Sequence, residues 1–140
     1  MRLHDVNVLI HAHRGESSEH ETHRDLIADE ISGEQTYAVC DYVINGFLRI
    51  VTNRRIYRTP TPVRQAVAFA DQFRHQPNAV VVTPGPRHWS IFTRLCEETG
   101  VTGEDVPDAF LAAIAIEHGC EFVTADKGFT RFQGLRLHQV

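Results

Sequence analysis

The chain has 140 residues, of which 42% are hydrophobic and 23% charged, and it carries a formal net charge of −4 at pH 7. This length fits a single domain, residues 1–140, that folds without disulfides or a structural metal, and the negative charge argues against a protein that simply coats nucleic acid. We expect neither a membrane span nor a signal peptide, and three cysteines without a CxxC pair indicate core residues in a reducing, cytoplasmic setting.

Strand-like and helix-like segments alternate through the first 83 residues. Residues 2–5 are expected to form a short strand that ends at Asp5, and Asn7 is placed to cap the helix that follows. The further elements expected here are a helix over 20–33, a strand over 37–40, a helix capped by Asp41, a helix with Val63, Val67, Ala70 and Phe73 on its apolar face, and a fully buried strand over 79–83.

The same alternation continues to the end of the chain. The elements expected are a turn at 84–86, a helix over 87–99 with Trp89, Phe92 and Leu95 facing the core, an alanine-rich helix opened by Asp108, a strand over 121–126, a short turn or helix, and a last strand near 135–140. Alternating strands and helices predict an α/β fold, a three-layer sandwich with a central, mostly parallel sheet flanked by helices.

Three aspartates lie where such a fold gathers functional groups. Asp5 and Asp126 end predicted strands, whose carboxyl ends meet at one edge of a parallel sheet, and Asp108 opens a helix whose alanines allow close packing. Converging carboxylates repel one another, and a hard divalent cation such as Mg²⁺ or Mn²⁺ relieves that repulsion. Asp108 also suits a simple helix N-cap, and Asp126 suits a turn before Gly128, so spacing alone leaves these structural roles open.

Four segments of the chain match the motifs of one known protein family. They are DVNVLI at 5–10, GFLRIVTN at 46–53, VPDAFLAA at 106–113 and TADKGF at 124–129. In this order they resemble the N-terminal motif, the middle helix with its following loop, the DAxLAA segment and the TxDxxF motif of VapC toxins, which are PIN-domain ribonucleases. The resemblance implies a PIN-domain-like fold and a metal-dependent endoribonuclease of a type II toxin–antitoxin pair.

The resemblance also implies roles for individual residues. Asp5, Asp108 and Asp126 would be catalytic and would bind Mg²⁺ or Mn²⁺, while Asn7 and Thr124 would support them through polar contacts. The implied reaction is attack of metal-activated water on an RNA phosphodiester, which leaves a 5′-phosphate and a 3′-hydroxyl. The implied partners are an RNA substrate, such as a transfer RNA or a ribosomal RNA loop, a VapB-type antitoxin that enters the acidic site, and a second copy in a homodimer.

One position departs from the family pattern. Many PIN domains carry a glutamate on the middle helix where this chain has Gly46. Glu104 or Asp105, in the loop before Asp108, could supply a fourth carboxylate instead. The departure leaves the number of bound metal ions open.

A basic cluster follows the middle helix. It consists of Arg49, Arg54, Arg55 and Arg58. We expect these arginines to bind RNA phosphates, and a solvated loop is the alternative interpretation.

Two other functions compete with the ribonuclease. Asp5-Val6-Asn7 is similar to the DxD motif of haloacid dehalogenase-type phosphohydrolases, in which Asp5 would be a nucleophile, but Asn7 replaces the general acid that this chemistry needs. The glycine at position 46 would instead fit a non-catalytic RNA-binding PIN-like domain.

Overall fold

The computed structural model describes all 140 residues, and a five-stranded sheet forms its centre. The strands are β1 (Arg2–His4), β2 (Tyr37–Val39), β3 (Ala79–Val81), β4 (Glu121–Thr124) and β5 (Arg136–Gln139). Their order is β3-β2-β1-β4-β5, and every neighbouring pair is parallel. The predicted α/β architecture is therefore confirmed, with a sheet that is wholly rather than mostly parallel.

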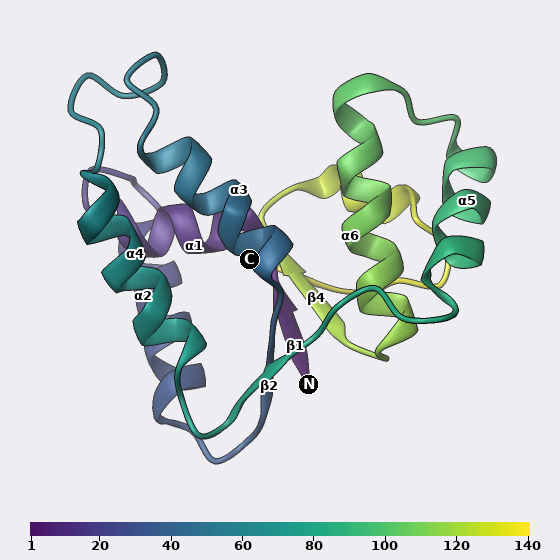
Figure 1. The fold of residues 1–140 in the computed structure, drawn as a ribbon, viewed down its shortest axis with the longest axis horizontal. Coiled ribbons are helices and arrows are strands. Elements are labelled where there is room, and N and C mark those ends of the chain that lie inside the picture. The colour runs from purple at the N-terminus through teal and green to yellow at the C-terminus, as the bar shows by residue number, and fades with distance from the viewer.

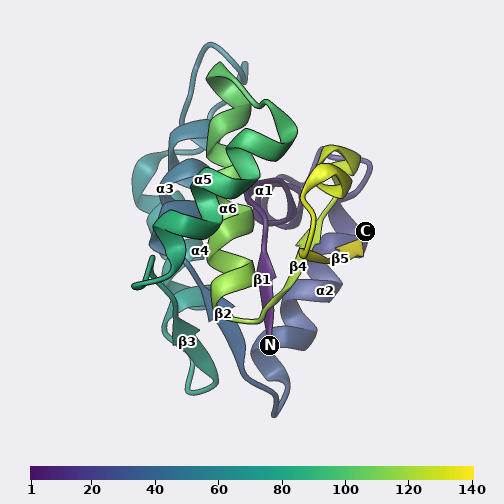
Figure 2. The same cartoon turned by 90° about the vertical axis from the view of Figure 1, so that its right-hand side faces the viewer.

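Helices connect the strands and cover the sheet. They are α1 (Val6–His13), α2 (His20–Ser32), α3 (Asp41–Val51), α4 (Val63–Arg74), α5 (His88–Thr99), α6 (Val106–Glu117) and the 3₁₀ helices η1 (Gly103–Asp105) and η2 (Lys127–Arg131). Figure 1 shows α1 to α4 on one side of the molecule and α5 with α6 on the other, with the strands between them. In Figure 2 the α5–α6 pair faces the viewer. No helix combines the length and the apolar character needed to cross a membrane.

Most helix ends lie where the sequence predicts them. α2 ends at Gly33 and α5 at Gly100, whose φ of 69° is a conformation that favours glycine. The expected capping role of Asp41 is wrong. Cys40 is the N-cap of α3 and makes no side-chain capping bond, while Asp41 lies 2.7 Å from Arg74 in an ion pair.

The core lies between the sheet and the helices. β2 is buried along its whole length, as expected for a central strand of a parallel sheet that is covered on both faces. Ala109, Ala112 and Ala113 are fully buried, so α6 approaches the sheet as closely as the sequence predicts. The three cysteines are all free and lie in or beside this core.

The strand expected over 79–83 is not fully buried. It pairs only with β2, at the edge of the sheet, and Val80 and Val81 are 40% and 45% exposed. Val82, just beyond the strand, is the buried valine of the segment. A run of valines therefore marks an edge strand here, because the sheet has no further strand to cover it.

Two predicted helix faces are also wrong in part. On α4 the buried face is formed by Ala66, Ala70 and Phe73, whereas Val63 is 64% exposed. The small alanines let α4 pack closely, so the valine stripe is turned outward. On α5 Trp89 is 72% exposed, because its neighbour His88 is the residue that points inward and contacts the Phe110 carbonyl of α6 at 3.0 Å.

Candidate active site

The sheet itself positions the first two candidate residues. β1 and β4 are parallel neighbours, with His4 opposite Val123, and the backbone N–H of Asp5 donates to the Val123 carbonyl at 2.9 Å. The residues that follow both strands therefore meet at one edge of the sheet. This edge is the carboxyl end at which α/β sheets place functional groups.

Asp5 is held at this edge by two hydrogen bonds. Its Oδ1 accepts from the backbone N–H of Val6 at 2.7 Å, and its Oδ2 accepts from the Thr124 hydroxyl at 2.6 Å. The first bond makes Asp5 the N-cap of α1, so the predicted capping role of Asn7 is wrong. Asp5 is only 6% exposed, and no arginine or lysine pairs with it.

Asn7 and Thr124 join α1 to the loop after β4. The Asn7 amide donates to the Thr124 hydroxyl oxygen at 3.3 Å and accepts from the Ala125 N–H at 3.3 Å. The same hydroxyl oxygen accepts from the Asp126 N–H at 3.0 Å. Thr124 is fully buried, so this network fixes how the Asp5 and Asp126 segments lie relative to each other.

Asp126 and Asp108 lie at the beginnings of η2 and α6. Asp126 is the N-cap of η2 and accepts from the Gly128 N–H at 2.7 Å, so the structural role left open by the sequence is present. Asp108 lies in the first turn of α6 rather than at its N-cap. Its Oδ2 lies 3.1 Å from the guanidinium of Arg131, a residue that none of the four sequence motifs includes.

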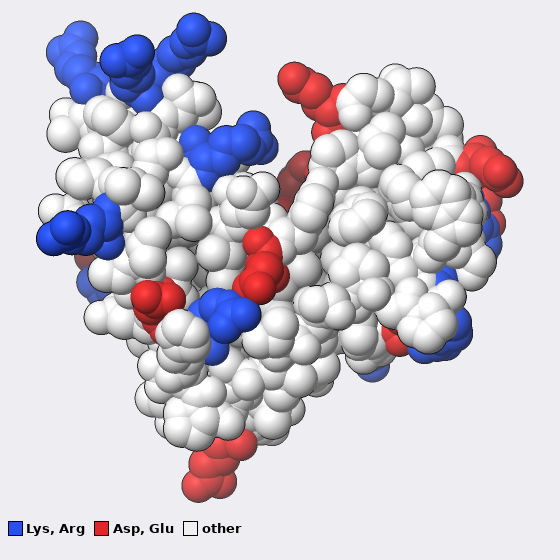
Figure 3. All heavy atoms as spheres, viewed as in Figure 1, with Lys and Arg blue, Asp and Glu red and all other residues white.

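A groove brings these side chains together. It has a volume of about 670 Å³, and its polar and charged lining residues are Asp5, Asn7, Tyr42, Asn45, Arg49, Glu104, Asp108 and Asp126. Figure 3 shows the surface hollowed between the two sides of the molecule, with basic side chains gathered on the upper left and acidic ones across the hollow.

The carboxylates influence one another across the groove. Burial, with a smaller contribution from the charges of Asp108 and Asp126, raises the pKa of Asp5 to about 6 against the opposing hydrogen bonds from Thr124 and Val6. Burial also raises the pKa of Asp108, which the Arg131 charge lowers and the Asp126 charge raises. The three carboxylates therefore repel one another, and binding of a proton or a cation would relieve that repulsion.

Known proteins resemble this chain along almost its whole length. The family model described as PIN domain matches residues 3–135. The chain belongs to the PIN-domain family. This PIN domain is 41% identical over 136 residues to ribonuclease VapC25 and 40% identical to ribonuclease VapC31, both from Mycobacterium tuberculosis, and each match covers 97% of this chain and 96% of the relative. The similarity to VapC ribonucleases that the four motifs predict is confirmed.

Solved structures share the fold of this PIN domain. VapBC2 from Rickettsia felis, bound to a DNA fragment from its promoter, has a TM-score of 0.67 at 17% identity and covers 97% of this chain and 96% of its own. VapC20 from Mycobacterium tuberculosis has a TM-score of 0.65 at 19% identity and covers 95% of this chain and 97% of its own. Membership of the PIN-domain family rules out the haloacid dehalogenase alternative.

The groove of this PIN domain carries oxygen atoms of the kind that bind a hard divalent cation. The groove offers carboxylate oxygens, which Mg²⁺ and Mn²⁺ prefer, and Asp5 is a buried carboxylate without a basic partner. No three His, Cys, Asp or Glu side chains are arranged as a complete metal-binding cluster. Mg²⁺ commonly uses one or two carboxylates together with waters and substrate phosphates, so the donor set fits a cation that is completed by its substrate.

The acidic residues considered for the missing fourth position differ in placement. Glu104 lines the groove, whereas Asp105 lies 3.7 Å from Arg131 and is turned toward it. A Cβ at Gly46 would lie 3.0 Å from Cγ2 of Val6, so a side chain at this position would require Val6 to move. The PIN domain therefore packs Val6 close to the backbone at the position where other family members carry an acid.

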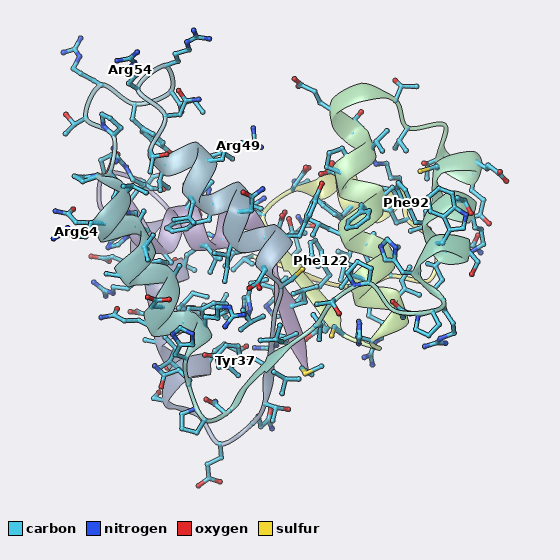
Figure 4. The ribbon with its side chains drawn as sticks, in the orientation of Figure 1. Tyr37, Arg49, Arg54, Arg64, Phe92 and Phe122 are labelled. Carbon is cyan, nitrogen blue, oxygen red and sulfur yellow. The ribbon has the colours of Figure 1, made fainter.

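The four arginines of the predicted RNA-binding cluster do not all lie in the groove. Arg49 lines the groove, while Arg54, Arg55 and Arg58 lie on the exposed loop beyond α3, as Figure 4 shows for Arg49 and Arg54. None of the four takes part in an ion pair. These cations are therefore available to an outside partner, with Arg49 nearest to the acids.

Proposed function

We propose that this PIN domain is a metal-dependent endoribonuclease and the toxin of a VapBC-type pair, and that it folds and acts as one domain over residues 1–140. The observation that carries the proposal is the convergence of Asp5, Asp108 and Asp126, from three separate segments, on one groove. The relatives named ribonucleases support the activity, and one structural neighbour is described as a sarcin–ricin loop cleaving toxin.

The proposed mechanism depends on how the chain holds its carboxylates. Thr124 and the Val6 N–H fix both oxygens of Asp5, so this side chain is a rigid anchor at the bottom of the site. Asp108 and Asp126 would complete the cation-binding edge, with Asn7 and Thr124 keeping the β4 loop in place. A bound Mg²⁺ or Mn²⁺ would supply Lewis-acid polarisation of the phosphodiester and would lower the pKa of a water. The proposed products, from attack of water on phosphorus with cleavage of the P–O3′ bond, are a 5′-phosphate and a 3′-hydroxyl.

The arginines suggest the path of the RNA. The protein carries net negative charge, so attraction to RNA has to be local. Arg49 would hold a phosphate beside the acids, and Arg54, Arg55 and Arg58 would bind the strand as it leaves the groove. The ring of Tyr57, on the same loop, already lies 4.0 Å under the Arg14 guanidinium. We expect a single-stranded loop of a transfer or ribosomal RNA to follow these arginines.

The proposed protein partners follow from the same groove. The structural neighbours include toxin–antitoxin complexes, among them one from Klebsiella pneumoniae with a TM-score of 0.63 at 15% identity. We expect a VapB-type antitoxin to enter the acidic groove with a basic side chain and thereby to compete with the cation. A homodimer is the expected state of the free toxin.

One assay tests the proposed activity. The purified chain is incubated with a structured RNA in Mg²⁺, in Mn²⁺ and in chelator, beside Asp5→Asn and Asp108→Asn, with the exposed Asp29→Asn as the matched control. We expect cleavage only with the metal, loss of cleavage in both groove variants and full activity in the control. Cleavage that survives chelator, or that both groove variants retain, would overturn the proposal, and RNA binding without cleavage would identify a non-catalytic RNA-binding domain.

A further inference from the structure

One basic side chain outside the groove lining pairs with an acid of the candidate site. Arg131, the last residue of η2, places Nη2 3.1 Å from Oδ2 of Asp108 and Nη1 3.7 Å from Oδ2 of Asp105. Its guanidinium also lies 4.9 Å from the ring centre of the buried Phe132. The side chain is therefore held by two carboxylates and an aromatic ring, rather than extending freely into solvent.

Arg131 is distinct among the cations near the groove. It is the only arginine or lysine that pairs with any of Asp5, Asp108 and Asp126. Arg49, by contrast, lines the groove but makes no ion pair. An arginine cannot lose its proton at physiological pH, so its charge beside Asp108 is permanent.

A permanent positive charge at this position opposes a second cation. A divalent ion bound at Asp108 would lie within several ångströms of the Arg131 guanidinium, and two cations at that distance repel each other even in a watery groove. The ion would also compete with Arg131 for the oxygens of a single, partly exposed carboxylate. Binding of a divalent ion at Asp108 and the ion pair between Asp108 and Arg131 therefore disfavour each other.

On this basis we propose that Arg131 is a positioning residue that holds Asp108 in the metal-free protein and weakens metal binding until RNA is present. The inference rests on the proposed metal-dependent function of the same groove. The planar fork of an arginine matches a phosphate oxygen pair as well as it matches a carboxylate. An RNA phosphate in the groove would take over the guanidinium and release Asp108 to the cation, so metal and RNA would bind together.

The test measures metal affinity directly, without RNA. Mn²⁺ is titrated by calorimetry into the wild-type chain and into Arg131→Gln, Arg131→Met and Arg131→Lys. The glutamine keeps a hydrogen-bond donor, the methionine keeps an apolar stem over Phe132, and the lysine keeps the charge. Arg94→Gln is the matched control, because it removes one arginine from an exposed ion pair with Glu98 at 3.0 Å, outside the groove lining. Circular dichroism checks that each variant is folded.

We expect the two uncharged Arg131 variants to bind Mn²⁺ about three- to tenfold more tightly than wild type, and Arg131→Lys and Arg94→Gln to match wild type. Measurable binding by the uncharged variants where wild type binds none would support the proposal equally. Unchanged or weaker binding in both uncharged variants, or no binding by any form, would overturn it. Asp5→Asn distinguishes this result from failure of the proposed function, since Mn²⁺ binding that Asp5→Asn leaves intact would lie outside the proposed site.

Discussion

The hydroxyl of Thr124 donates a 2.6 Å hydrogen bond to Oδ2 of Asp5 and thereby joins the carboxyl ends of β4 and β1. The same oxygen accepts from Asn7 and from the Asp126 backbone, so one buried atom links three residues of the site. The bond to Asp5 favours the ionised carboxylate, in opposition to the burial that favours the protonated form. Thr124 therefore influences both the charge of Asp5 and the position of the Asp126 loop.

Replacement of Thr124 by valine removes this hydroxyl with little change of shape. We expect Thr124→Val to raise the pKa of Asp5 above that of wild type, so that the acid limb of the RNA-cleavage profile moves to higher pH. Stability in urea should fall by about 1–3 kcal/mol, because the buried Asp5 carboxylate loses its donor and two part-buried donors lose their acceptor. Thr124→Ser keeps the hydroxyl and should restore both properties. An unchanged pH profile in Thr124→Val would contradict the assigned role.

The raised pKa of Asp5 predicts a cost to folding at neutral pH. Because the folded-state pKa of about 6 lies above the ordinary 3.8, the folded protein binds this proton more tightly than the unfolded chain does. The stabilisation that this bound proton gives is complete below pH 3.8 and is lost as the pH rises through about 6. Asp5→Asn removes the charge and keeps a residue that can cap α1. In chelator at pH 7.5 it should therefore be about 2–3 kcal/mol more stable than wild type.

The measurement is urea unfolding of both proteins at pH 7.5 and pH 4. The advantage of Asp5→Asn should shrink toward pH 4, where wild-type Asp5 is mostly protonated. Asp29→Asn, an exposed carboxylate outside the groove, should show no such pH-dependent difference. An equal effect of Asp5→Asn at both pH values would show that something other than the charge determines the stability difference.

Sequence periodicity predicts the elements of this fold better than their faces. Apolar runs and glycine stops place the strands and helices, because both depend on local backbone preferences. Burial of a face depends on what the neighbouring element offers, and that information is not local. Val63 is exposed because alanines provide the closer contact for α4, and Val81 is exposed because β3 is an edge strand.

The candidate site also combines features that local sequence predicts with features that it does not. Asp5 and Asp126 could be placed at one edge from the rule that parallel strands end together, and the groove lining agrees with that placement. The Arg131 contact could not be foreseen, because it spans 23 positions and no short motif encodes it. The capping of α1 by Asp5 rather than Asn7 was equally hidden, since both residue types suit an N-cap; here Asp5 accepts from the Val6 N–H, whereas Asn7 bonds to Thr124.

Gly46 offers a test of why the usual glutamate is absent. A Cβ there would lie 3.0 Å from Val6, so Gly46→Ala should gain helix propensity but lose it again to this contact, with a net change near zero. In a Val6→Ala background the contact is absent, and Gly46→Ala should stabilise the protein by about 1 kcal/mol. Thermal unfolding of wild type, Gly46→Ala, Val6→Ala and the double variant measures the coupling free energy between the two positions. Strictly additive effects would exclude the contact with Val6 as the reason for the glycine at position 46.

The same background allows the missing acid to be restored. Gly46→Glu in Val6→Ala adds a carboxylate to the groove lining, so we expect tighter Mn²⁺ binding than in Val6→Ala alone. Gly46→Gln is the matched control, since it has the same shape without the charge. Equal Mn²⁺ affinity in the glutamate and glutamine variants would mean that position 46 does not face the cation.

Arg49 differs from the other exposed arginines because it lines the acidic groove. If it binds a phosphate beside the acids, Arg49→Ala should weaken RNA binding and reduce the slope of log affinity against log salt by about 0.7, the value for one phosphate of a single strand. Arg64 is the matched control, because this exposed arginine lies on α4, far from the groove in Figure 4. Binding is measured in an Asp5→Asn background, so that cleavage does not interfere. Equal salt slopes for Arg49→Ala and Arg64→Ala would show that Arg49 contributes only general charge, whereas a loss confined to Arg49→Ala would locate the bound strand in the groove.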